Sequence, residues 1–307
     1  MNCIFGVDIG GTEIKIGKFY NEQLVLKTSI KTNTEDNSKY VFPDVFAKID
    51  QLLDGDTLVG IGVGVPGPVL GGKVLGAHNL GWGKIDAEAL IKGYYPNIST
   101  VVLNDANAAA VGEMAVGSAQ KYKSFIFMTL GTGIGGGIII DGNLVEGNSG
   151  SAGEIGHIRV GFNNERKCSC GLYDCVEQYG SATGIVRTAN ILRINQETIL
   201  NEIEVTSKNI FDYAKKGDRV CLEVVDHMVE KLSTALAAIT NTLNPEAIVI
   251  GGGVSKAGDF LLNRLEKRFK ELAFYSVLDT EFALATLGND AGIYGTSYAV
   301  RKKINAN

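Results

Sequence analysis

The feature that most limits the possible folds of this chain is an internal duplication. Residues 4–17 read as an apolar strand, a turn containing Gly10, Gly11 and Thr12, and a second strand, and residues 125–142 repeat this plan. A repeated supersecondary unit indicates two related domains. At 307 residues the chain is also long enough for two domains of ordinary size.

The second copy contains a Gly-x-Gly-x-x-Gly pattern at positions 131–136, but its context excludes a dinucleotide-binding turn. Such a turn must open a helix, whereas residues 137–140 are typical of a strand. Glycine lets backbone N–H groups approach a polyphosphate closely, and threonine adds a hydroxyl donor. A plain hairpin is the alternative for one turn alone, and two turns with the same chemistry favour phosphate binding. The candidate residues of the second turn are Gly131, Thr132 and Gly133.

A third glycine cluster follows an apolar strand at residues 248–250. An amphipathic helix is predicted before it, over 222–243, and ends at Asn244-Pro245. Another helix is predicted over 258–272, which completes an α/β unit. Open α/β sheets bind ligands beyond the carboxyl ends of their strands, so we expect an adenine or ribose against the glycines. The candidate residues are Gly252 and Gly253.

Polar residues stand at the end of a further predicted strand. Asn104 and Asp105 follow the apolar run 101–103 and precede an alanine-rich helix. The commoner use of such an aspartate is as a helix N-cap. The alternative is that Asp105 accepts a proton from a substrate hydroxyl as it attacks a phosphoryl group. The Gly/Pro turn at 66–68 and the loop at 78–82 suit a neutral polyhydroxylated ligand, with the only tryptophan as an aromatic face beside it.

One of the three histidines and three of the five cysteines fall between positions 157 and 175. One imidazole and three thiolates complete a tetrahedral zinc site and leave no position for a catalytic water. Buried thiols or a disulfide are the alternatives, although Cys168 and Cys170 are too close for a comfortable bridge. No leader-like segment precedes the first strand, so we expect a reducing, cytoplasmic compartment, where such clusters bind metal. The set is His157, Cys168, Cys170 and Cys175, flanked by Glu154 and Glu177.

Charge and composition exclude two classes of partner. The formal net charge is −5 and the only basic run is at 301–303, which gives no support for a nucleic-acid partner. No uninterrupted apolar segment approaches the length of a membrane span. A hydrophobic content of 45% and a charged content of 21% are typical of a soluble globular protein.

Taken in order, these motifs resemble those of the ROK family of bacterial sugar kinases and related repressors. Residues 8–12 and 130–133 resemble the two phosphate motifs of that family. The sugar and zinc signature is similar to 153–157 with 168–177, and the adenosine motif to 250–253. The matches extend over almost the whole chain.

The resemblance implies an actin-like, RNase H-like α/β fold of two lobes, with Mg·ATP and a hexose in the cleft between them. It implies Asp105 as general base and a structural zinc ion on one ring nitrogen of His157, whose other nitrogen meets the sugar. Asp8 is expected to help position Mg²⁺ near the phosphates. The implied substrate-binding residues are Gly67, Asn79, Asn104, Asp105, Glu154, His157 and Glu177. The implied nucleotide-binding residues are Asp8, Gly10, Gly11, Thr12, Lys15, Gly131, Thr132, Gly133, Gly252 and Gly253.

Two positions depart from the family pattern. Glu13 stands where lysine or asparagine is usual, and we expect its side chain to point away from the triphosphate, on the face that it shares with Lys15. Asp174 stands where glycine is usual before the last cysteine. Aspartate is tolerable there if the backbone requires a positive φ.

The expected organisation is a small lobe of residues 1–117 completed by a C-terminal helix within 290–307, and a large lobe of 118–289 with the zinc and adenosine sites. Residues 183–217 are expected to be helical, with no chemistry assigned. The loop at 79–82 resembles the glucokinase branch, which favours phosphorylation of glucose to glucose 6-phosphate. N-acetylmannosamine, N-acetylglucosamine and fructose are alternative substrates, and a non-catalytic sugar-sensing regulator is the alternative of another class. The resemblance and the frequency of C₂ assemblies favour a homodimer.

Overall fold

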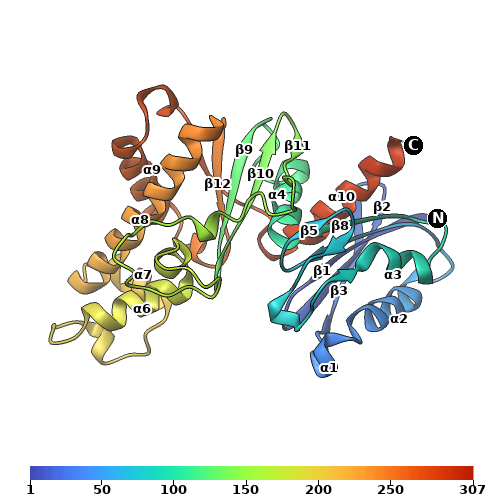
Figure 1. Ribbon diagram of the computed structural model, residues 1–307, viewed down its shortest axis with the longest axis horizontal. Helices are drawn as coiled ribbons and strands as arrows, with labels where there is room; N and C mark the ends of the chain where they lie inside the picture. Colours follow the sequence, from blue (N-terminus) through green and yellow to red (C-terminus); the bar gives the residue numbers. More distant parts are fainter. Residues whose placement is uncertain (307) are drawn as a thin grey trace. The chain divides into compact units, whose positions relative to one another are not determined.

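The computed structural model describes residues 1–306, and these divide into two units with separate cores. The first unit contains residues 1–121, 137–153 and the described part of 287–307 (Figure 1). The second contains residues 122–136 and 154–286. The two units are described separately below.

The first unit is built on a five-stranded sheet with the order β3-β2-β1-β4-β8. β1 pairs antiparallel with β2, which pairs antiparallel with β3, whereas β4 lies parallel to both β1 and β8. The first predicted strand–turn–strand copy is therefore the β1–β2 hairpin. The strands are β1 (Asn2–Ile9), β2 (Glu13–Tyr20), β3 (Gln23–Lys31), β4 (Thr57–Val65) and β8 (Ser99–Asn104).

Helix α10 (Ala291–Asn305) packs on one face of this sheet at very short range, because two strands present glycine to it. A Cβ atom on Gly6 of β1 or Gly62 of β4 would overlap backbone atoms of α10. Alternate β1 residues such as Phe5 and Val7 face the other side and pack in a hydrophobic cluster with α2 (Val41–Leu53) and α3 (Ala87–Tyr94). The sheet is thus covered on both faces.

Helix α4 (Asp105–Val116) follows β8 directly and packs backbone to backbone against α10. Added Cβ atoms on Gly112 and Gly295 would overlap carbonyl groups of the facing helix. This close packing fixes the first turn of α4 relative to the sheet. The smaller elements of the unit are α1 (Glu35–Ser38), η1 (His78–Leu80), η6 (Gly288–Asp290), β11 (Asn143–Leu144), and a three-stranded sheet of β5 (Val69–Leu70), β6 (Lys73–Val74) and β7 (Ile85–Asp86).

The second five-stranded sheet has the order β11-β10-β9-β12-β13, in which β12 lies parallel to β9 and β13. Adjacent strands β9 and β10 are the second copy of the duplicated plan, and β10 confirms that a strand, not a helix, follows the glycine-rich turn. The further strands are β9 (Phe125–Leu130), β10 (Ile134–Ile140), β12 (Ala247–Gly251) and β13 (Glu281–Leu284).

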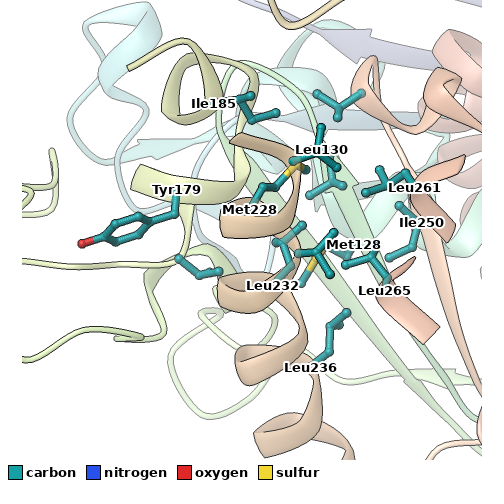
Figure 2. Close-up of a cluster of buried hydrophobic side chains, with 14 of the residues drawn as sticks. Met128, Leu130, Tyr179, Ile185, Met228, Leu232, Leu236, Ile250, Leu261 and Leu265 are labelled. Atoms are coloured by element: carbon teal, nitrogen blue, oxygen red, sulfur yellow. The ribbon is translucent and has the colours of Figure 1, made fainter. Parts of the chain in front are cut away.

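Helices of the second unit enclose a single large cluster of buried apolar side chains. Figure 2 shows Met128 and Leu130 of β9 facing Met228 and Leu232 of α8. Ile250 and Leu265, from β12 and α9, extend the cluster. The helices are α5 (Glu177–Gly180), α6 (Ala182–Leu192), α7 (Ser207–Ala214), α8 (Arg219–Leu243) and α9 (Asp259–Leu272), with 3-10 turns η2 (Ile155–His157), η3 (Ile199–Asn201), η4 (Val254–Ala257) and η5 (Tyr275–Val277).

The predicted helix ends are confirmed where a local signal defined them. Helix α8 ends at Leu243, and its cap Asn244 takes the left-handed conformation with φ 46°. Asparagine tolerates this conformation, and Pro245 prevents the helix from continuing. None of the helices within residues 1–306 combines the length and the apolar character that a membrane crossing requires.

Candidate active site

The junction of β8 and α4 places Asn104 and Asp105 at a helix N-terminus. Asn104 is the N-cap, and its side-chain oxygen accepts hydrogen bonds from the backbone N–H groups of Ala106 and Asn107 at 2.9 and 3.1 Å. The capping role considered for Asp105 therefore belongs to its neighbour. Asp105 is the first residue of the helix, where the positive end of the helix dipole favours a carboxylate.

Asn104 also connects this junction to the turn after β4. Its side-chain amide donates to the carbonyl oxygen of Gly67 at 3.1 Å. Gly67 has φ 86°, and a Cβ there would overlap the carbonyl group of Gly76, so no other residue fits. Gly67 and Asn104, predicted separately as sugar ligands, are thus neighbours.

The structure corrects one expectation about the loop at 78–82. Asn79 lies beside the first glycine turn, since a Cβ on Gly11 would contact the Asn79 side chain at 3.7 Å. Trp82 is only 6% exposed and stacks on Phe42 with ring centroids 5.7 Å apart. The expectation of an aromatic face for a ligand is therefore wrong, because packing against α2 has covered the ring.

The first Gly/Thr turn is held by two hydrogen bonds to the backbone of Gly10. Gly10 N–H donates to the carbonyl of Glu13 at 3.0 Å, and the Thr32 hydroxyl donates to the carbonyl of Gly10 at 2.7 Å. Gly11 and Thr12 remain exposed at the tip of the turn. The Glu13 side chain is exposed to solvent.

Asp8 lies at the base of this turn, with its carboxylate 3.6 Å from the Lys15 ammonium. Its surroundings are tight, since a Cβ on Gly292 of α10 would approach the carboxylate to 2.7 Å. Burial raises the pKa of Asp8 above its ordinary value, and Lys15 only partly opposes this. A carboxylate with an energetic cost of ionisation, beside a predicted phosphate turn, is typical of a functional site.

The second Gly/Thr turn adjoins Glu177 within the other unit. Gly131 N–H donates to the carbonyl of Gly133 at 3.0 Å, and Ile134 N–H donates to the Glu177 carboxylate at 3.0 Å. A side chain on Gly133 would overlap that carboxylate. A predicted phosphate turn and a predicted sugar ligand are therefore in direct contact.

The start of α6 supports the same turn, which the sequence did not reveal. Ala182 N–H donates to the carbonyl of Gly131 at 2.8 Å, and the Thr183 hydroxyl donates to the carbonyl of Thr132 at 2.8 Å. Ser181 caps α6. A capping serine is a local signal for the start of a helix, but no local signal marks the contact of this helix with a turn some fifty positions earlier.

Gly252 approaches the same region from β12. It has φ 84°, and a Cβ there would meet the backbone of Leu130, the last residue of β9, at 2.5 to 2.6 Å. Only glycine therefore lets the third glycine cluster lie against the end of β9. Gly253 follows it at the start of η4.

The four predicted metal ligands converge. Their ligand atoms all lie within 4.8 Å of one another, with His157 Nδ1 3.6 Å from Cys168 Sγ and Cys170 Sγ 3.7 Å from Cys175 Sγ. Ligands about 2.3 Å from a tetrahedral zinc ion are separated by similar distances. All five cysteines are free thiols, so the disulfide alternative is wrong. The donor set fits a structural zinc ion.

The side chains of the cluster shift one another's ionisation in opposite directions. Burial opposes ionisation of Cys168, yet hydrogen bonds from Cys170, Cys175 and His157 lower its pKa to about 7. Burial and the neighbouring sulfurs raise the pKa of Cys175 to about 12. Thiolates this close together repel one another, so a bound cation is needed to hold all three in the ionised form.

His157 has its two ring nitrogens on different partners. Nδ1 faces the sulfur cluster, whereas Nε2 lies 3.9 Å from the Glu154 carboxylate. Glu177 is also close to the cluster, with one carboxylate oxygen 4.0 Å from Cys168 Sγ. The predicted ligands of the second unit thus gather around the metal site. The other predicted substrate ligands belong to the first unit and are Gly67, Asn79, Asn104 and Asp105.

Comparisons with known proteins find relatives over nearly the whole chain. A family model described as ROK family matches residues 4–303. The glucokinase of Halalkalibacterium halodurans is 39% identical, over 98% of this chain and 96% of that protein. A ROK family glucokinase from Streptomyces griseus, solved in complex with glucose and AMPPNP, is 31% identical with a TM-score of 0.81, over 98% and 99% of the two chains. A xylose repressor of Caldicellulosiruptor bescii is 34% identical over 71% of this chain and 56% of its own length.

Proposed function

This chain belongs to the ROK family and has its actin-like ATPase fold, and from that premise we propose that it is an ATP-dependent glucokinase. It would transfer the γ-phosphoryl group of Mg·ATP to glucose and release glucose 6-phosphate. The observation that carries the proposal is the β8–α4 junction, where Asn104 caps the helix and Asp105 stands in its first turn. Full-length similarity to glucokinases supports the choice of sugar.

In the proposed mechanism, Asp105 accepts the proton of the attacking 6-hydroxyl group. The neighbouring sugar hydroxyls are held by Gly67, Asn79, Asn104, Glu154, His157 and Glu177. Backbone N–H groups of the two Gly/Thr turns stabilise the charge that develops on the transferred phosphoryl group. The Lys15 ammonium binds the same phosphates, and the adenosine lies against Gly252 and Gly253.

The cluster of His157, Cys168, Cys170 and Cys175 would hold zinc. When bound, the ion supplies a fixed positive centre that keeps three thiolates and one imidazole in place. His157 Nδ1 faces the cluster, which leaves Nε2 to meet a sugar hydroxyl. No position is left for a catalytic water, so we assign the ion a structural role.

A panel assay tests the proposed function. Purified protein is incubated with Mg·ATP and, separately, glucose, fructose, mannose, N-acetylmannosamine and N-acetylglucosamine, and ADP release is measured. Preference for glucose supports the proposal. Preference for an acetamido sugar would retain the fold, base and zinc site but replace the substrate, and absence of turnover on every sugar would overturn the proposal.

The second candidate, a non-catalytic sugar-sensing regulator, has one observation in its favour. The xylose repressor is 34% identical over 71% of this chain, although the match spans only 56% of that protein. Sugar binding without ADP release in the panel assay would favour it. We further propose that the protein is cytoplasmic and forms a homodimer, and sedimentation of the purified protein tests the second of these.

Asp8 gives a prediction in which activity and stability change in opposite directions. Burial raises the folded-state pKa of Asp8, so its ionisation destabilises the fold as the pH rises through that pKa. Asp8→Asn removes this cost, and we expect a melting temperature at pH 7.5 equal to or above that of the wild type. The advantage should vanish at acid pH, where both proteins are neutral at this position.

The same substitution should reduce glucokinase activity at least about tenfold, because an amide is a poor partner for Mg²⁺. Thermal melts at several pH values and initial rates over a range of Mg²⁺ concentrations measure the two effects. Lower stability at neutral pH together with unchanged activity would show that Asp8 has only a structural role.

A further inference from the structure

A buried carboxylate lies within the metal-binding segment, residues 157–175, which contains the four predicted ligands. Asp174 precedes Cys175, is 0% exposed and has φ 58°. Its Oδ1 accepts three hydrogen bonds, from the backbone N–H groups of Glu165 and Arg166 at 3.0 and 2.9 Å and from the Tyr179 hydroxyl at 2.8 Å. Because three donors bind one oxygen, this side chain acts as a junction that holds the 165–166 backbone and Tyr179 together.

The backbone of Asp174 extends the same junction. Its N–H donates to the carbonyl of Arg166 at 2.8 Å, and its carbonyl accepts from Val160 N–H at 2.9 Å. Gly161 leaves room for it, since a Cβ there would lie 3.0 to 3.1 Å from Asp174 Cβ and Cγ. Asp174 therefore joins the part of the segment that follows His157 to the part that contains Cys175.

Tyr179 connects this junction to the core. Its ring is 1% exposed, and the buried Arg166 guanidinium lies 4.2 Å from the ring centroid. Arg166 donates to the carbonyl of Gln178 at 2.7 Å and to the Thr188 hydroxyl at 2.9 Å. Figure 2 shows the ring extending from α5, with its hydroxyl directed away from the labelled core side chains. The hydroxyl of Tyr179 is thus the link between α5 and Asp174.

Helix α5 contains only residues Glu177–Gly180, so Glu177 and Tyr179 belong to a single turn. The Glu177 carboxylate accepts from Ile134 N–H at 3.0 Å and leaves no space for a side chain on Gly133. A shift of α5 would move this carboxylate off the glycine turn. Its position depends on the contacts that hold the helix, which include the Cys175 carbonyl before it, Arg166 at the Gln178 carbonyl and Asp174 at the Tyr179 hydroxyl.

We infer that Asp174 is a positioning residue for Glu177: by binding the Tyr179 hydroxyl and the 165–166 backbone, it sets where the Glu177 carboxylate meets the sugar. This inference rests on the proposed function, in which Glu177 binds sugar hydroxyls. It assigns a role to the carboxylate itself, beyond conformational tolerance of a positive φ.

The test compares Asp174→Gly with Asp174→Asn in the full-length, zinc-loaded enzyme. Glycine adopts the positive φ without strain and keeps both backbone hydrogen bonds, but leaves three donors without their acceptor. We expect the KM for glucose to rise about tenfold, with the KM for ATP within about twofold of the wild type. Asparagine keeps the Oδ1 acceptor, and its glucose KM should stay within about twofold of the wild type.

A second variant tests the path through Tyr179. Tyr179→Phe removes one donor and leaves the ring, so its glucose KM should rise less than that of Asp174→Gly. Because both changes break the same link, the double variant should be no worse than Asp174→Gly alone. Metal content, measured by atomic absorption, should stay at the wild-type level in every variant.

The outcomes separate the inference from its premise. Wild-type turnover with an unchanged glucose KM in Asp174→Gly would overturn the inference alone, as would a lower melting temperature as the sole effect. Loss of zinc from Asp174→Gly would also overturn it, because the residue would then act through the metal site. Absence of wild-type turnover on every hexose would overturn the proposed function, and the inference with it.

Discussion

Asp105→Asn is expected to lower kcat for glucose phosphorylation by about 10³-fold, within the range that general acid–base groups contribute. The amide has nearly the shape of the carboxylate, and its oxygen can still accept the Ala106 N–H hydrogen bond that Asp105 makes at 2.8 Å. It cannot accept the proton of the attacking hydroxyl group. The helix keeps its cap, because Asn104 provides it. Glucose binding and thermal stability should therefore change little.

Asp259→Asn is a matched control for this substitution. Asp259 is also the first residue of a helix, α9, and it is exposed to solvent. The same loss of charge at a helix N-terminus should leave kcat within about twofold of the wild type. Steady-state ADP release and calorimetric glucose binding compare the two variants. A kcat for Asp105→Asn close to that of the control would exclude Asp105 as the base.

Much of the fold could be predicted from the sequence, because the signals that define its turns and helix ends are local. Glycine at the end of β1 and β9 marked both turns, and the αL cap at Asn244 ended α8 where predicted. The hydrogen bond between Asn104 and Gly67 could not be predicted in the same way. It depends on β4 and β8 lying side by side, which is a property of strand order rather than of either segment.

The site residues show the same division between local and long-range information. The metal cluster was predicted correctly because four ligand residues of the right types lie close together in sequence. Trp82 was misjudged, since its exposure depends on α2, some forty positions earlier. The contact of α6 with the second glycine turn was missed for the same reason. Residue type indicates what a side chain can do, and topology decides which partner it meets.

Removal of the metal site is the second change with a large expected effect. Cys175→Ser replaces a fully buried ligand, and the remaining donors no longer complete a tetrahedral set. We expect zinc to be lost and the melting temperature to fall, because structural zinc contributes directly to folding free energy. The value of kcat/KM for glucose should fall by about 10²-fold, since His157 and Glu177 both adjoin the cluster.

Cys221→Ala separates loss of metal from loss of a buried thiol. Cys221 is also 0% exposed, but it lies in α8 within the hydrophobic cluster and outside the ligand set. Its replacement should lower stability by a packing effect of about 1 kcal/mol, with zinc content and glucose KM unchanged. Metal analysis, thermal melts and glucose kinetics on both variants measure the difference. Retention of both zinc and the wild-type glucose KM by Cys175→Ser would contradict the ligand set and the role assigned to the cluster. The sugar ligands His157 and Glu177 would then have to be held by packing alone.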